Sequence, residues 1–577
     1  MCTRIGLSRC NVSVGRQAFK AHLRKHQFDA LGAAICTSNI GPHRLTHRGL
    51  PRSIGQKGLA MSQVKKILIV GGGTSGWLAA NYLVRMLGGV EVTLIESKDI
   101  PTIGVGEATI PPIRTLVAAL GIEEAEFMKA ASATFKIGLK FNNWLHAPDR
   151  PGDVAHSYYH VFGNFGQVDG QLLAPYWALD SERGDKSFVD YTMVEGGVCD
   201  AGRSPKRITD PQYSGPIQYA YHFDAGKLVD FLKDYGKAKG VKHLIGNVTE
   251  TVLGDDGNIA RLHTQELGDL EADLFIDCTG FAGHLIEKKL GTDYTDLMDV
   301  LFCDSAVALQ VPFSDPKTAI NPFTTVTAQS EGWTWDIPLN NRRGIGYVHS
   351  SKYTEPEEAE RVLRQYIGAE AEGIEARHLR FRTGYRREQW KGNCVAIGLS
   401  AGFLEPLEST GIYLVDAALR LLVDLVSTTE KFPIAANDFN KRMSATFEDI
   451  VDFVKLHYVL TKRTDTQFWT DNTDPATWTD SLKDKVESWS ARVPGVYEFS
   501  GFPNVFGLTN YMQILYGMDF GPDLTGQEQR YSMMAKARQQ AQNFAKGVQG
   551  GIQVMPEHRA IIDEIYSSGF KPVRRQI

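Results

Sequence analysis

Three glycines near residue 70 have the spacing of a dinucleotide-binding turn. They follow a short apolar run at residues 67–70 and precede an apolar helical stretch at 78–87. In a strand-turn-helix context, such glycines permit a tight turn, close approach of a pyrophosphate and close packing of helix on strand. The N-terminus of the helix adds N–H groups and a positive dipole end that favour phosphate. The candidate residues are Gly71, Gly73, Thr74, Ser75 and Gly76.

A single nucleotide site is predicted, and FAD is favoured over NAD. Glu96 ends a second apolar run at 90–95, where an acid can bind a ribose hydroxyl. No second G-x-G-x-x-G follows a strand, whereas DCTGF (277–281) and GLSAG (398–402) look like the further backbone approaches by which flavoproteins of the hydroxylase type enclose FAD. Further candidate contacts are Gly106, Gly280, Gly398 and Leu399.

The elements around these motifs predict an α/β fold. Residues 134–141 alternate as a half-buried strand, with Lys136 and Lys140 on the polar face. The pattern also predicts a helix over 222–239 capped by Asp224, a turn at 255–258, strands at 274–277 and 394–397, and a helix over 412–427. The predicted fold is a Rossmann-like FAD-binding domain of the flavin monooxygenase type, interleaved with a substrate lobe and followed by a mainly helical C-terminal region.

Composition divides the chain into three parts. Residues 1–60 carry ten Lys/Arg against one acid and show no hydrophobic periodicity, so we expect a disordered extension, with Met61 as the natural start. We expect the FAD-binding core and substrate lobe over 61–435, and a helical substrate-covering region and tail over 436–577.

Charge, hydropathy and cysteine content narrow the function classes. A net charge of −5 gives no basic field for nucleic acid, and no apolar run is long enough to span a membrane. The seven cysteines include no CxxC pair, which argues against a zinc site or a disulfide framework and fits a reducing cytoplasm.

Five segments together resemble one enzyme family. They are GGGTSGW (71–77), IPTIGVGEATIP (100–111), ATFKIGLKF (133–141), GWTWDIP (332–338) and FLEPLESTGIY (403–413). In this order they are similar to the flavin-dependent tryptophan halogenases, over roughly residues 64–520. The resemblance implies that reduced FAD, dioxygen and chloride or bromide give hypohalous acid, which travels through an internal passage to an aromatic substrate.

The resemblance also implies roles for single residues. Lys136 looks like the lysine that meets hypohalous acid, either as a hydrogen-bond donor or as a haloamine. Glu408 resembles the glutamate that polarises this oxidant or takes the ring proton. Thr410 and Gly411 resemble the halide site, and residues 101–107 the strap that couples the flavin and substrate sites. From the residues alone, Lys136 could equally face solvent, and Glu408 could be a helix-start acid.

The expected substrate site matches the family unevenly. His160 and Phe162 resemble the aromatic walls that stack an indole, with Phe506 and Asn510 as further candidates. Ordinary packing explains the two aromatic walls equally well. Members acting on free tryptophan carry a Tyr-Tyr pair and a Glu that grip the amino-acid backbone. Here both are missing from 493–511, with Gly501 in the place of the Glu, which favours indole or a larger indole-bearing molecule.

Two other functions remain open at this point. An FAD-dependent aromatic monooxygenase shares the fold but needs neither Lys136 nor the WTWDIP segment. A non-catalytic flavin-binding protein needs neither Lys136 nor Glu408. As partners we expect a small aromatic substrate, a separate NAD(P)H-dependent flavin reductase that supplies reduced FAD and, by family resemblance, a second copy in a homodimer.

Overall fold

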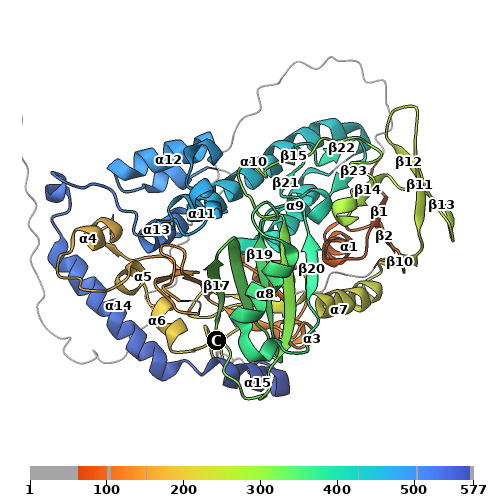
Figure 1. Ribbon diagram of the computed structural model, residues 1–577. Helices are drawn as coiled ribbons and strands as arrows, with labels where there is room; N and C mark the ends of the chain where they lie inside the picture. The colour runs from red at the N-terminus through yellow and green to blue at the C-terminus, as the bar shows by residue number, and fades with distance from the viewer. Residues whose placement is uncertain (1–62, 101–105, 151, 427, 502–504, 572–577) are drawn as a thin grey trace, which may run out of the picture. The chain divides into compact units, whose positions relative to one another are not determined.

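A parallel sheet is built around the predicted strand-turn-helix unit (Figure 1). The computed structural model describes residues 63–571 apart from 101–105, 151, 427 and 502–504. The sheet runs in the order β10-β2-β1-β14-β23-β22, and only β22 is antiparallel to its neighbour. The strands are β1 (Lys66–Val70), β2 (Glu91–Glu96), β10 (Lys242–Ile245), β14 (Leu274–Asp277), β22 (Trp390–Lys391) and β23 (Cys394–Ala396).

The carboxyl ends of three of these strands meet at the glycine turn. Gly71 follows β1 with φ +116°, and a Cβ there would overlap the carbonyl oxygen of Cys278, which follows β14. Gly398 follows β23 with φ +79°, and its Cβ would overlap the Ser75 hydroxyl in the first turn of α1 (Thr74–Met86). Ligands of open α/β sheets bind at such an edge, where strand ends converge.

A second, seven-stranded sheet carries the WTWDIP segment. Its order is β20-β16-β19-β18-β17-β5-β6, and only the β17 and β5 pair is parallel. The WTWDIP residues form most of β18 (Gly332–Pro338). The other strands are β5 (Gly138–Asn142), β6 (Ser157–Val161), β16 (Ser305–Pro312), β17 (Phe323–Gln329), β19 (Arg342–His349) and β20 (Arg377–Arg380).

The predicted strand over 134–141 is two strands, and the prediction that it is half-buried was wrong. β4 (Thr134–Lys136) pairs with β9 (Ala220–Asp224), whereas β5 belongs to the seven-stranded sheet. The chain passes from one sheet to the other at Ile137. Its N–H donates to the Pro322 carbonyl, and its carbonyl accepts from the Phe162 N–H. Residues 134–139 are all buried, so of the apparent polar face Lys136 and Gly138 are covered and only Lys140 is partly exposed.

The remaining sheets and hairpins are small. β9 is central in a three-stranded sheet between β3 (Gly106–Ala108) and β4. The predicted turn at 255–258 joins β11 (Val248–Leu253) to β12 (Ile259–Thr264), as expected. The other short strands are β7 (Gln167–Val168), β8 (Gln171–Leu172), β13 (Gly268–Leu270), β15 (Thr295–Asp296), β21 (Gly384–Tyr385) and β24 (Gly402–Phe403).

Two helices predicted from the sequence are present with altered bounds. α7 covers Ala225–Ala238, and Asp224 caps it by accepting from the Lys227 N–H at 3.1 Å. His222 lies in β9 and not in this helix, since it still pairs with Ala108 of β3 and with Thr134 of β4. α9 covers Gly411–Leu425, close to the predicted 412–427.

Helices dominate the chain after residue 431. α10 (Phe432–Val459) is buried along its last two turns, and α14 (Met534–Val554) packs beside α5 (Phe188–Thr192) and α6 (Glu195–Asp200), far away in sequence (Figure 1). Among the described residues, no helix is long and apolar enough to cross a membrane. The other helices are α2 (Pro112–Leu120), α3 (Glu124–Ala130), α4 (Ala174–Leu179), α8 (Pro356–Ile367), α11 (Gln467–Asn472), α12 (Asp480–Ala491), α13 (Leu508–Gly517) and α15 (His558–Ser568).

The glycine turn yields a matched pair of substitutions. Gly71→Ala places a Cβ at positive φ and against a backbone carbonyl, so we expect the free energy of unfolding to fall by about 2 kcal/mol or more. Gly73→Ala meets no atom within 4 Å, so its stability should stay within about 0.5 kcal/mol of wild type. Urea unfolding of both apoproteins measures this difference, and equal losses would contradict the described turn.

Candidate active site

Lys136 is a buried amine and does not face solvent. Its side chain is fully buried, and Nζ donates to the Ser409 hydroxyl at 2.8 Å and lies 5.4 Å from the centre of the Phe162 ring. Burial lowers the pKa of Lys136 to about 7, and the negative charge of Glu408 partly opposes this shift. Near neutral pH the side chain is therefore present both as amine and as ammonium.

Lys140 shares a face with Lys136 in the sequence pattern but lies in a different environment. Its side chain is 28% exposed, and its ammonium pairs with Asp200 at 3.1 Å, over the ring of Tyr159. This partly exposed pair has the character of a surface ion pair. The two lysines are separated because the chain changes sheets between them.

Glu408 lies in the same buried region, bonded to histidine. One carboxylate oxygen, Oε2, is 2.8 Å from Nδ1 of His160, and the other, Oε1, lies 2.9 Å from Nε2 of His457. Desolvation alone would raise the pKa of this carboxyl, but the two imidazoles outweigh it and lower the pKa to about 2. Glu408 is therefore a buried carboxylate and not a solvated helix-start acid.

The hydrogen bonds around His160 define its tautomer. Asn510 accepts the Gly507 N–H through Oδ1 at 2.9 Å, so its amide nitrogen donates to Nε2 of His160, also at 2.9 Å. Nδ1 of His160 therefore carries the proton and donates to Glu408. Asn510, expected among the substrate residues, orients the histidine in this structure.

His457, which the sequence analysis did not single out, completes the surroundings of Glu408. Its Nδ1 donates to the Phe453 carbonyl at 2.9 Å, which leaves Nε2 facing the carboxylate. Nε2 and Oε1 face each other at this distance without the geometry of a hydrogen bond, and the imidazole helps to lower the pKa of Glu408. Nothing in the sequence around His457 indicated this, because the contact joins α10 to a loop 49 positions earlier in the chain.

Aromatic rings flank this polar group. Phe506 stacks on Phe453 with ring centres 3.8 Å apart and 15° between the planes, and His160 lies 6.4 Å from Phe506. Phe162 lies under the Lys136 ammonium. The structure thus brings all four predicted substrate residues, His160, Phe162, Phe506 and Asn510, to the neighbourhood of Lys136 and Glu408.

The predicted halide residues, Thr410 and Gly411, lie at the start of α9, directly after Ser409, the hydrogen-bond partner of Lys136. Ser409 has φ +59°, which turns the chain so that Thr410 precedes the first residue of the helix, Gly411. A Cβ at Gly411 would meet no atom within 4 Å, so the backbone is open there. Helix N-termini of this kind favour anions.

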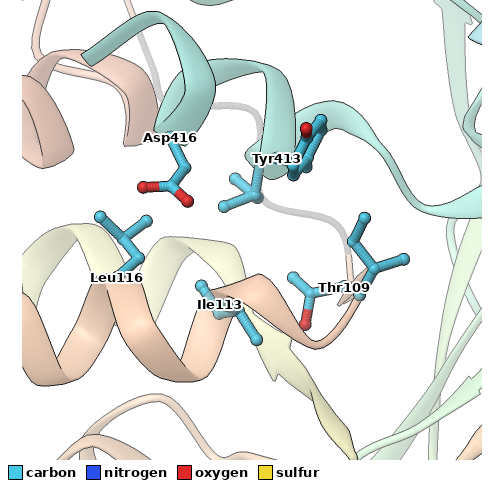
Figure 2. Close-up of a pocket in the computed structure, with 7 residues that line it drawn as sticks. Thr109, Ile113, Leu116, Tyr413 and Asp416 are labelled. Atoms are coloured by element: carbon cyan, nitrogen blue, oxygen red, sulfur yellow. The ribbon is translucent and has the colours of Figure 1, made fainter. Parts of the chain in front are cut away.

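A small pocket lies immediately beside this helix start (Figure 2). Tyr413 and Asp416 of α9 face Ile113 and Leu116 of α2 across it. The Asp416 carboxylate is held by Arg420 at 2.7 Å. The pocket lies between α9, where the predicted halide residues begin the helix, and residues 109–116, which follow the predicted strap; strap residues 101–105 lie outside the described residues. Its lining comprises Thr109, Ile110, Ile113, Leu116, Ile412, Tyr413 and Asp416.

The predicted nucleotide residues lie at the edge of the parallel sheet except for Gly106, which lies in β3 against Ile337 and Gly344 of the seven-stranded sheet. Glu96 pairs through Oε1 with Lys233 at 3.0 Å and His243 at 2.8 Å. Its other oxygen lies against the backbone of Gly72, where a Cβ would overlap it. One carboxylate oxygen thus faces the glycine turn. Gly280, with φ +68°, lies in the loop after β14, and Gly398 and Leu399 lie in the loop after β23. Both loops reach the glycine turn, because Cys278 lies against Gly71 and Gly398 lies against Ser75. Gly106 begins β3.

Comparison with known proteins identifies the family. The model of the family described as tryptophan halogenase matches residues 66–534. The chain belongs to the tryptophan halogenase family. It is 41% identical over 478 residues to the tryptophan 6-halogenase SttH of Streptomyces toxytricini, which covers 78% of this chain and 89% of the relative.

Solved structures support the same assignment. A tryptophan halogenase from Shewanella frigidimarina matches with a TM-score of 0.82 at 34% identity, covering 88% of this chain and 99% of its own. Xcc4156, a flavin-dependent halogenase from Xanthomonas campestris, matches with a TM-score of 0.79 at 33% identity, covering 88% and 99%. These matches confirm the predicted family, the flavin-dependent enzyme class and the α/β fold.

The Glu408 cluster predicts a pH-dependent loss of stability. Glu408→Gln leaves the buried Lys136 ammonium without a compensating charge. We therefore expect the free energy of unfolding to fall by about 3 kcal/mol at pH 7. Because folding lowers the pKa of Glu408 from 4.5 to about 2, its contribution is complete above pH 4.5 and declines as the pH falls toward 2. Urea unfolding between pH 7 and 4 should show that the difference in free energy of unfolding between wild type and Glu408→Gln begins to decrease at the acid end.

A control variant distinguishes the buried carboxylate from a partly exposed carboxylate whose pKa is also lowered. Glu498 also has a pKa lowered to about 2, but its side chain is 30% exposed and pairs with Arg492. Glu498→Gln should cost less than about 1 kcal/mol. Equal losses in the two variants, or a Glu408→Gln gap that does not change with pH, would contradict the buried cluster.

Proposed function

We propose that this protein halogenates an electron-rich, indole-type ring, using reduced FAD, dioxygen and chloride or bromide, with hypohalous acid held at Lys136. The observation that carries the proposal is the burial of Lys136 beside Glu408, in a chain of the tryptophan halogenase family. A buried amine with a pKa of about 7 can donate a hydrogen bond as ammonium or react with hypohalous acid as free amine.

Glu408 receives the proton that the ring loses. As the carbon–halogen bond forms, the ring carbon gains a positive charge that a nearby carboxylate stabilises. Release of the ring proton restores the aromatic system, and the Glu408 carboxylate accepts that proton. His160 keeps the carboxylate oriented through its Nδ1–H.

The edge of the parallel sheet fits FAD. The pyrophosphate would lie on the glycine turn at the start of α1, open at Gly73, and an adenosine ribose hydroxyl would bind the Glu96 oxygen that faces Gly72. Gly106, Gly280, Gly398 and Leu399 would lie near the flavin end. When bound in reduced form, FAD supplies with dioxygen the oxidising power that converts halide to hypohalous acid.

Halide and reductant have separate sources. Thr410 and Gly411, at the N-terminus of α9, would hold the halide. The chain has one dinucleotide motif, so a separate NAD(P)H-dependent reductase would supply reduced FAD.

Product analysis tests the proposal. Purified protein with FAD, a flavin reductase, NADH, oxygen and bromide or chloride should give an indole product with the halogen isotope pattern by mass spectrometry. Lys136→Met, similar in length but without the amine, should lower product formation at least 100-fold while NADH oxidation continues. Lys140→Met, at the surface pair, should retain activity within about twofold.

The outcomes separate the candidate functions. Hydroxylated indole in place of a halogenated product would identify a monooxygenase. Flavin binding with no product from indole, tryptophan or a tryptophan-containing peptide would indicate a non-catalytic flavin protein. An unchanged rate in Lys136→Met would remove Lys136 from the mechanism.

The substrate is proposed to be an indole without a free amino-acid group. Near the aromatic walls, the acid of the 493–501 stretch, Glu498, is already bonded to Arg492 and Trp489, so it is not available for a substrate ammonium. Gly501 stands where the tryptophan-binding relatives of the resemblance have a glutamate.

Restoring that acid should change specificity. Gly501→Glu should lower the KM for tryptophan about tenfold through a charge-assisted contact, leaving the KM for indole within twofold. Ser500→Glu, one position away, serves as the charge-matched control. A wild-type kcat/KM for tryptophan above that for indole would contradict the proposed substrate class.

A further inference from the structure

The WTWDIP and FLEPLEST segments are joined by a single buried carboxylate. Glu405, the first acid of FLEPLEST, accepts two hydrogen bonds through Oε2, from the Trp333 indole N–H at 2.8 Å and from the Tyr458 hydroxyl at 2.7 Å. All three side chains are buried, with Glu405 and Trp333 each 1% exposed. Glu405 therefore ties β18 to α10 through the molecule's interior.

This carboxylate is incompletely bonded. Its second oxygen, Oε1, has no hydrogen-bond partner among the described residues. Burial raises the pKa of Glu405, whereas the Trp333 and Tyr458 donors and the charge of Lys455 act in the opposite direction. The Cys303 thiol also acts on this carboxyl, so Trp333, Tyr458, Cys303 and Lys455 together favour the ionised form, against the burial that favours the neutral one.

Lys455 supplies the matching positive charge. It lies on α10 one turn before Tyr458, fully buried, with Nζ donating to Asn472 at 2.8 Å and 4.7 Å from the centre of the Phe302 ring. Burial lowers the pKa of Lys455 to about 7, and the charge of Glu405 raises it. Each charge is costly to bury alone, and each favours the charged form of the other.

One loop and one helix thus carry two buried charge clusters. Between Glu405 and Glu408 the chain makes a 3-10 turn, so the two carboxylates have different partners. α10 contributes to both clusters, with Tyr458 and Lys455 for Glu405 and His457 for Glu408. The first cluster contacts the tryptophan strand, and the second surrounds the predicted site of halogenation.

We propose that Glu405 is a positioning residue that holds the Trp333 indole and thereby fixes the β18 strand, whose Pro338 carbonyl accepts from Thr134, two residues before Lys136. The proposal rests on the proposed halogenase function. A hydrogen bond to an ionised acceptor is about twice as strong as one between neutral groups, so the charge of Glu405 matters as well as its shape. Trp335 lies on the same strand, with its ring over Gly346 and 6.3 Å from that of Trp333.

The test measures coupling, defined as halogenated indole formed per NADH oxidised. Glu405→Gln retains shape and acceptor but loses the charge, and it should lower coupling at least threefold. Trp333→Phe should lower coupling similarly, and the double variant E405Q/W333F should be no worse than either single variant. Glu331→Gln, an acid just before the same strand that accepts no bond from Trp333, is the matched control and should keep wild-type coupling.

A second comparison separates positioning from mere stability. Glu405→Gln alone leaves the Lys455 charge without compensation, so the protein should be less stable to urea. The charge-neutral variant E405Q/K455M should regain stability but keep the low coupling. If coupling recovers together with stability, or if Glu405→Gln couples like wild type, the proposal is overturned.

Hydrogen exchange provides a readout that does not depend on catalysis. In the apoprotein, the amides of Trp333–Ile337 should exchange at least fivefold faster in Glu405→Gln than in wild type, and not in Glu331→Gln. If wild type forms no halogenated product, the proposed function fails while this measurement still decides whether Glu405 holds Trp333. Unchanged exchange would overturn the positioning role.

Discussion

The candidate active site depends on burying a lysine and a glutamate together in the same region. Neither charge is stable alone in a water-poor interior, and each makes the other's charged form less costly. Burial holds the pKa of Lys136 to about 7, while the two imidazoles keep Glu408 ionised. The site therefore offers both an amine of near-neutral pKa and a carboxylate base without exposing either to solvent.

Three features of the fold bring Lys136 and Glu408 into one buried region. The chain leaves one sheet and joins another at Ile137, which buries Lys136 while Lys140 remains at the surface. The positive φ of Ser409 turns the 405–410 loop so that its hydroxyl meets Lys136. The buried end of α10 then provides His457 as a partner of Glu408.

The sequence predicted those features that depend on local pattern. The glycine turn, β1, α1, the Asp224 cap and the 255–258 turn are each specified within a few residues, and they were found as predicted. The family resemblance supplied Lys136 and Glu408, which the residues alone left undecided. Alternation over 134–141 misrepresented burial, because a face that is polar by residue type can be covered by other parts of the chain. His457, Glu405 and Lys455 escaped notice because their partners are brought together only by long-range packing.

The most direct measurement is the ionisation of Lys136 itself. In deuterated protein carrying ε-¹³C lysine, the signal absent from a Lys136→Arg variant identifies this side chain, and its chemical shift can be followed from pH 5 to 10. The account predicts a titration midpoint near 7 that moves lower in Glu408→Gln, since that variant removes the charge that favours the ammonium. A midpoint near the ordinary lysine value of about 10.4, unaffected by Glu408, would contradict it.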